Sequence, residues 1–127
     1  MSQVTQPRVR RVWVVLGASV LSSLLLATPA LAGDVQLSGL QSAPTHQRFI
    51  VKYRDGSAPV ANTTALASSL KTAAAGIASS QGRALGLQQV RKLAVGSTVV
   101  RTDRALDQAE SELLMRKLAA DPNVEYV

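Results

Sequence analysis

The sequence predicts an α+β fold of the ferredoxin-like type, a four-stranded antiparallel sheet with two helices on one face. Two segments carry apolar residues at the three-to-four spacing of amphipathic helices. Four short segments with strand character surround them in the order strand, helix, strand, strand, helix, strand. This is the βαββαβ order of the split βαβ plan. The second face of such a sheet stays open, and apolar residues on an open face form a surface for a partner.

The first strand is predicted at residues 48–53, RFIVKY. Successive side chains of a strand point to opposite faces, so Phe49, Val51 and Tyr53 share one face. An Asp-Gly turn follows and ends the strand. Because Ile50 on the other face is also apolar, we expect one face of the sheet to be fully covered and the other partly covered.

The second and third strands are predicted at residues 85–95 and 97–102, with Gly96 at a hairpin turn between them. The third segment, STVVRT, is rich in β-branched residues and is the better strand former. The second alternates poorly between polar and apolar residues. A continuous helix through residues 83–93 is therefore a competing interpretation.

The first helix is predicted at residues 64–80, which are rich in alanine. Either Thr63 or Thr64 can cap its first turn. Gly82 lies just beyond the apolar stripe, where a helix stop is expected. The stripe consists of Leu66, Leu70, Ala73, Ala74 and Ile77. Alanine buries little area, so this helix should depend on what it packs against.

The second helix is predicted to begin at a capping box formed by Asp107 and Glu110, which stand three residues apart. Leu106 precedes the cap and can pack back onto the helix as a hydrophobic staple. The predicted buried stripe consists of Ala109, Leu113, Leu114 and Leu118.

The final strand is predicted at residues 124–127, after Asp121-Pro122 has ended the helix. Strand alternation would place Val124 and Tyr126 on one face, and Glu125 and Val127 on the other.

Residues 1–32 have the pattern of a secretory signal peptide. Three arginines, Arg8, Arg10 and Arg11, precede an apolar run at residues 12–27. Ala30, Ala32 and Gly33 then form the predicted signal peptidase site. A transmembrane helix needs about 20 apolar residues, and this run is shorter and interrupted by serines. We therefore expect a secreted or periplasmic protein that uses the general secretory pathway and meets the membrane only transiently.

Residues 33–47 are predicted to be a flexible spacer, because polar residues interrupt any apolar period. The only histidine of the chain, His46, lies in this spacer, where we expect it to be solvated. No cysteine and no second histidine can complete a metal site with it. We therefore expect no metal and no cofactor. The packed domain is predicted to be residues 48–127.

The net charge of +6 would suit nucleic acid or an anionic surface. Removing the three arginines of the signal peptide lowers it to +3, which is unremarkable. A secreted basic binding module is the weakest interpretation, since sheet-based nucleic-acid recognition uses stacking aromatic residues. The part of the sequence after the signal peptide has only three aromatic residues, Phe49, Tyr53 and Tyr126. We therefore expect no nucleic-acid partner.

Three motifs together resemble the propeptide, or inhibitor I9, domain of secreted subtilisin-like serine proteases. They are RFIVKYRDGS at residues 48–57, VRKLAVGSTVVRTD at residues 90–103 and LAADPNVEYV at residues 118–127. The resemblance covers residues 48–127 and looks strongest to the pro-regions of extracellular proteases from Gram-negative bacteria. It implies the ferredoxin-like fold and a subtilisin-like protease as partner, in cis or in trans.

The resemblance also implies a mechanism. A domain of this family docks its sheet on the protease, templates its folding as an intramolecular chaperone and sends the segment after its last strand through the active-site cleft. On this chain the protease-binding residues would be Val124, Glu125, Tyr126 and Val127. The resemblance also implies that such a domain inhibits the protease tightly until it is degraded. The sequence ends before the segment that would fill the cleft, so strong inhibition by the chain alone is not expected.

An enzymatic role for the chain by itself is not expected. The part after the signal peptide carries one histidine and lacks the glycine-flanked serine and histidine motifs of a subtilisin-type triad. An alternative interpretation makes the chain the N-terminal part of an extracellular serine protease precursor whose catalytic domain lies in residues absent from this sequence.

Overall fold

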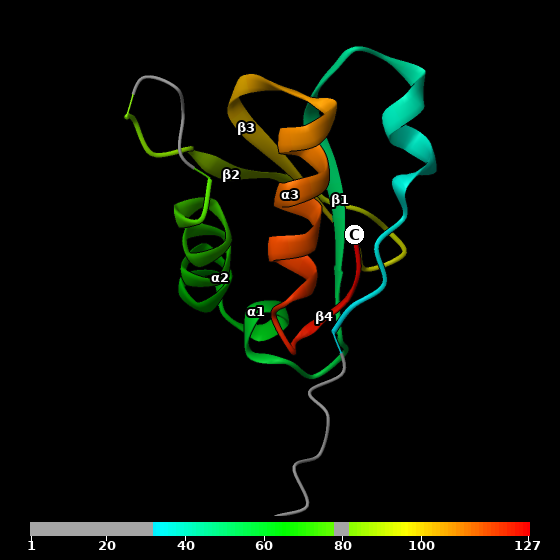
Figure 1. The fold of residues 1–127 in the computed structure, drawn as a ribbon. Helices are drawn as coiled ribbons and strands as arrows, with labels where there is room; N and C mark the ends of the chain where they lie inside the picture. The colour runs from blue at the N-terminus through cyan, green and yellow to red at the C-terminus, as the bar shows by residue number, and fades with distance from the viewer. Residues whose placement is uncertain (1–31, 78–81) are drawn as a thin grey trace, which may run out of the picture.

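A computed structural model describes residues 32–77 and 82–127. The predicted signal peptide lies almost entirely outside these residues. The elements are η1 (Leu37–Ser42), β1 (Thr45–Tyr53), α1 (Ala58–Ala61), α2 (Thr63–Ala75), β2 (Leu87–Lys92), β3 (Thr98–Asp107), α3 (Gln108–Ala119) and β4 (Val124–Tyr126). The strands form one sheet in the order β2-β3-β1-β4, with every pair of neighbours antiparallel. This is the predicted ferredoxin-like fold, which is confirmed (Figure 1).

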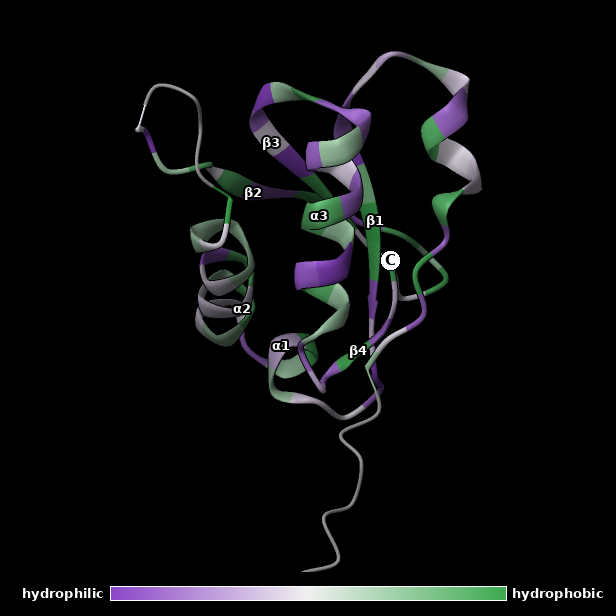
Figure 2. Cartoon of the chain, in the orientation of Figure 1, coloured by the Kyte–Doolittle hydropathy of each residue, from purple (hydrophilic) through white to green (hydrophobic). Residues whose placement is uncertain are grey.

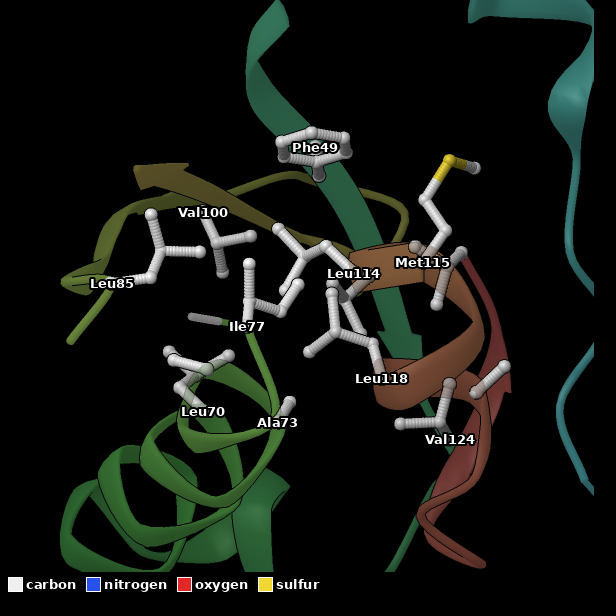
Figure 3. Close-up of a cluster of buried hydrophobic side chains, with 14 of the residues drawn as sticks. Phe49, Leu70, Ala73, Ile77, Leu85, Val100, Leu114, Met115, Leu118 and Val124 are labelled. Carbon is white, nitrogen blue, oxygen red and sulfur yellow. The ribbon is translucent and has the colours of Figure 1, made fainter. Parts of the chain in front are cut away.

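The core lies between one face of the sheet and the helices α2 and α3. Phe49, Val51 and Tyr53 of β1 are buried on this face, as their alternation predicts. Figure 3 shows Leu70 of α2 and Leu114 of α3 pointing into the same cluster as Phe49. Apolar residues are concentrated along the middle of β1 (Figure 2). All five predicted stripe residues of the first helix segment are buried.

The hairpin between β2 and β3 is confirmed, and the alternative helix through residues 83–93 is wrong. Gly96 has a φ of +79°, which suits glycine at the turn. The N–H of Leu93 donates to the carbonyl of Ser97 at 2.7 Å and closes the loop. β3 runs on to Asp107, beyond the predicted end, because after a shift in register Leu106 and Asp107 pair again with His46 and Thr45 of β1.

The first predicted helix corresponds to α2, and it differs from the prediction at both ends. Its cap is Asn62 instead of a threonine, because the Asn62 carboxamide oxygen accepts from the N–H of Thr64 at 2.8 Å. The helix ends at Ala75, well before Gly82. Gly76 follows it, where a Cβ would lie 2.9 Å from the side chain of Lys117.

The second helix begins at the predicted capping box, which is confirmed. Asp107 accepts from the N–H of Glu110 at 2.8 Å, and Glu110 accepts from the N–H of Asp107 at 3.3 Å. The hydrogen bond from the Arg104 guanidinium lowers the pKa of the Glu110 carboxyl. Leu106 is buried, as expected for a staple.

The buried stripe of α3 is rotated from the predicted one. Leu114 and Leu118 are buried as expected, but Ala109 is exposed and Leu113 is 43% exposed. The buried positions are Ser111, Leu114, Met115, Leu118 and Ala119. The helical period is the same, but η1 packs beside α3 and covers the side that carries Met115.

The expectation of an unpacked spacer at residues 33–47 is wrong. The N–H groups of Asp34 and Gln36 donate to the carbonyls of Glu125 and Val127 at 2.9 and 2.8 Å. Leu40 of η1 is buried in the core. The pairing with β4 is parallel and uses only backbone atoms, so it needs no apolar pattern in the sequence. Figure 1 shows this segment running beside β4.

Candidate functional site

The four residues predicted to bind a protease lie on and just after β4. Val124 and Val127 are buried in the core, Tyr126 is half-buried and Glu125 is exposed. β4 pairs with β1 on one side, and Asp34 lies beside it on the other. Only Glu125 and Tyr126 therefore offer side-chain surface to a partner, while the two valines fix the strand.

The predicted sharing of one face by Val124 and Tyr126 is wrong. Val124 pairs with Tyr53, whereas Tyr126 pairs with Lys52, and the register shifts between these two residues of β1. Paired residues of antiparallel strands point to the same side. Val124 thus faces the helices, and Tyr126 shares the opposite face with Lys52. This irregularity in register is a β-bulge, and it turns the side chain of Tyr126 to the sheet face opposite that of Val124.

The sheet face opposite the helices is not covered by any described helix, and we call it the open face. Its apolar centre contains Ile50, which is 50% exposed, paired with Val99 on β3. Strand alternation and register place nine residues on it. They are Arg48, Ile50 and Lys52 of β1, Gln88 and Arg91 of β2, Val99, Arg101 and Asp103 of β3, and Tyr126 of β4.

A hollow of about 490 Å³ opens at the edge of the open face where β1 and β4 meet η1. Its lining is mainly apolar and includes Leu40, Phe49, Ile50, Val95 and Tyr126. The hydroxyls of Tyr126 and Ser97 lie 2.8 Å apart, which holds the tyrosine ring against this hollow. The hollow has the character of a pocket for an apolar side chain.

His46 has a structural role, so the expectation of a solvated histidine is wrong. Its Nε2 lies 3.0 Å from the carbonyl oxygen of Leu40, and its ring is half-buried. The contact ties the start of β1 to η1. Within residues 32–77 and 82–127 no group of three His, Cys, Asp or Glu side chains could hold a metal ion.

A serine–carboxylate contact lies on the other side of the sheet. The hydroxyl of Ser69 donates to the carboxylate of Asp121 at 2.6 Å and lies 3.0 Å from the hydroxyl of Tyr53. No histidine takes part, so the contact lacks the base of a hydrolytic triad. Burial raises the pKa of Tyr53, the hydrogen bond with Ser69 lowers it and the charge of Asp121 raises it again. This network links β1, α2 and the end of α3.

The predicted signal peptidase site is only partly described. Ala32 is exposed and Gly33 is half-buried against β4, whereas Ala30 lies outside the described residues. In the part of the chain that the structure describes, no helix combines the length and apolar character needed to cross a membrane.

Comparison with known proteins gives one relevant relative. Over 113 residues the chain is 60% identical to a protein named extracellular protease from Xanthomonas campestris pv. campestris. These residues make up 89% of this chain but only 20% of the relative, so the chain spans about a fifth of the length of the curated relative it matches. No family model and no solved structure matches the chain. The chain is therefore similar to one region of an extracellular protease.

Proposed function

We propose that this chain is the non-catalytic pro-region of a subtilisin-like extracellular serine protease precursor. The observation that carries the proposal is the 60% identity to a protease that is about five times longer than the matched region. A region of that size, folded as a small ferredoxin-like domain with an open sheet face, suits a docking role better than catalysis. The same observation favours the interpretation in which the catalytic residues lie in parts of a precursor outside this sequence.

The sequence motifs that resemble inhibitor I9 propeptides support the proposal by where they lie. RFIVKYRDGS forms β1 and the turn after it, and VRKLAVGSTVVRTD forms most of the β2–β3 hairpin. LAADPNVEYV spans the end of α3 and β4. The motifs thus include parts of all four strands of the sheet that would dock on the protease.

The proposed inhibitory contact uses residues 124–127 in two ways. The buried side chains of Val124 and Val127 hold the strand in place, and Glu125 and Tyr126 face outward toward the protease. The chain after Val127 in a longer precursor would then enter the cleft. We propose that residues 124–127 by themselves make only part of the inhibitory contact, because two of their four side chains are buried in the core.

The proposed chaperone action follows from the stability expected of such a domain. Among the described residues its core contains only two aromatic side chains, those of Phe49 and Tyr53, and the chain has no cysteine that could form a disulfide. A partner that binds only the folded state adds to its stability by mass action. By the same linkage, the folded domain stabilises the protease conformation to which it binds.

A refolding assay tests the proposal. The catalytic region of a subtilisin-like extracellular protease is denatured and diluted into buffer with or without the secreted chain. We expect activity to return only when the chain is present, and activity of native protease to fall modestly at micromolar chain. A protease that refolds equally well without the chain, and is not inhibited by it, would contradict both roles.

We further propose that the chain is exported by the general secretory pathway and cleaved between Ala32 and Gly33. The mature domain would then begin at Gly33, because the backbone of residues 33–36 pairs with the end of α3 and with β4. Mass spectrometry of the protein from the culture medium should find Gly33 as the first residue. An intact first 32 residues in that protein would rule this cleavage out.

A further inference from the structure

Two arginines face each other at the centre of the sheet. Arg48 of β1 is the direct cross-strand partner of Arg101 of β3, and both side chains are exposed. Like charges directly opposite each other on neighbouring strands destabilise a sheet. Neither arginine forms an ion pair within the described residues. The pair therefore costs stability in the free domain without an intramolecular carboxylate to offset it.

The rest of the open face strengthens this positive charge. Arg91 of β2 lies opposite Val99, and its exposed side chain has no ion pair in the described part of the chain. Lys52, near the end of β1, already forms an ion pair, because its ammonium lies 3.1 Å from the Asp55 carboxylate. Asp103 also lies on this face by alternation, but it makes no ion pair with Arg101.

The apolar surface of the domain gathers around the same sheet. Four large apolar side chains are exposed among the described residues, and only Leu113 belongs to a helix. The others are Ile50, Val90 and Val95, which come from β1, β2 and the hairpin between β2 and β3. Ile50 and Val95 line the hollow beside Tyr126. Exposed apolar residues beside a charged rim are typical of a protein-binding surface.

We infer that the open face binds an acidic surface of the protease catalytic region. Carboxylates of that surface pair with Arg48 and Arg101, and an apolar side chain between them enters the hollow beside Ile50 and Tyr126. The inference rests on the proposed function and adds the chemistry of the partner. Complementary charge accounts for the cost of the arginine pair, because a carboxylate that bridges two guanidinium groups removes their repulsion on binding.

Binding of the chain to the catalytic region tests the inference. The chain is purified as secreted, the protease is blocked at its active site, and the dissociation constant is measured by calorimetry at several salt concentrations. We expect Arg101→Glu to weaken binding more than tenfold and to make the affinity less dependent on salt. Ile50→Ala should weaken it several-fold.

A matched control uses Lys71, an exposed residue of α2, the helix on the opposite side of the sheet. Lys71→Glu makes the same change in net charge as Arg101→Glu but should change affinity less than twofold. Melting curves separate binding from folding. Arg101→Glu creates an opposite-charge pair with Arg48, so this variant should melt no lower than the original chain while binding more weakly.

Three outcomes would overturn the inference. If Arg101→Glu and Lys71→Glu bind alike while the original chain binds tightly, the proposed function survives and the acidic partner surface does not. If the original chain shows no binding at micromolar concentration, the proposed function is contradicted, and the inference that rests on it is contradicted as well. Binding of a single-stranded oligonucleotide in competition with the protease would assign the open face to nucleic acid instead.

Discussion

The N–H of Gly33 donates to the carbonyl oxygen of Ala119, the last residue of α3, at 2.7 Å. A Cβ at Gly33 would lie 2.9 Å from the carbonyl oxygen of Val124 and 3.0 Å from its side chain. Two segments more than eighty residues apart thus meet where only a glycine fits. The hydrogen bond also satisfies one of the carbonyls left without an intrahelical partner at the end of α3.

Gly33→Ala should therefore weaken the attachment of the N-terminal segment. Crowding against a backbone oxygen cannot be relieved by a rotamer change, and overpacking of this kind costs about 1–3 kcal/mol. Urea unfolding of the secreted chain should show a lower free energy of unfolding. Gly39→Ala is the control, since a Cβ at Gly39 would meet nothing within 4 Å. Equal stability of the two variants would contradict a role for the close contact at Gly33.

The order of the four strands and of the two longer helices, α2 and α3, could be predicted because most of these elements have a local signal. β1 has alternating apolar residues, the hairpin has Gly96, and α3 has the Asp107–Glu110 capping box. Residues 33–47 have no such signal. They are held by backbone hydrogen bonds to β4 and by Leu40, whose burial depends on a surface built from distant parts of the chain.

The candidate site could be predicted only to the level of strand β4. Alternation places Val124 and Tyr126 together, but a bulge opposite Lys52 and Tyr53 separates them. A bulge depends on the pairing of two strands and has no period within one strand. The pairing of Arg48 with Arg101 could not be predicted either, because a cross-strand pair can be identified only when the register of the two strands is known.

Asn62→Ala should destabilise the domain by about 1 kcal/mol through loss of the α2 cap. The Asn62 side chain accepts from two N–H groups of the first turn, those of Thr64 and Ala65. Thr64→Ala is a matched control, because Thr64 is exposed and is one of the two caps that the sequence alone suggests. Thermal unfolding should show a lower melting temperature for the asparagine variant only. A larger effect at Thr64 would restore the sequence-based assignment.

Arg101→Gln should raise stability by about 0.2–1 kcal/mol, because it removes a like charge directly opposite Arg48. Arg91→Gln is the control, since Arg91 faces Val99 and has no charge across from it. Urea unfolding at low salt should show the difference, and added salt should reduce it.

A double variant isolates the contribution of the pair itself. In Arg48→Gln/Arg101→Gln the second substitution has no repulsion left to remove, so the gain should be smaller than the sum of the single gains. Strict additivity would show that the two charges do not interact.

The raised pKa of Tyr53 should make the free energy of unfolding depend on pH in the alkaline range. Burial raises the pKa of its phenol above the ordinary value of 10.0, although the hydrogen bond with Ser69 opposes this shift. Below pH 10 the phenol is neutral in both the folded and the unfolded chain. Above pH 10 the unfolded chain loses the proton first, so the free energy of unfolding falls as pH rises toward the folded pKa.

Tyr53→Phe removes the contribution of the phenol to the pH dependence of the free energy of unfolding. At pH 7 the variant should lose about 1 kcal/mol with the hydrogen bond to Ser69. Between pH 9.5 and 11 its free energy of unfolding should fall less steeply than that of the original chain, so the two curves converge. Urea titrations at half-unit pH intervals measure both slopes, and lysines that titrate in this range cancel in the difference. Parallel curves would show that the Tyr53 proton is bound equally in the folded and unfolded states.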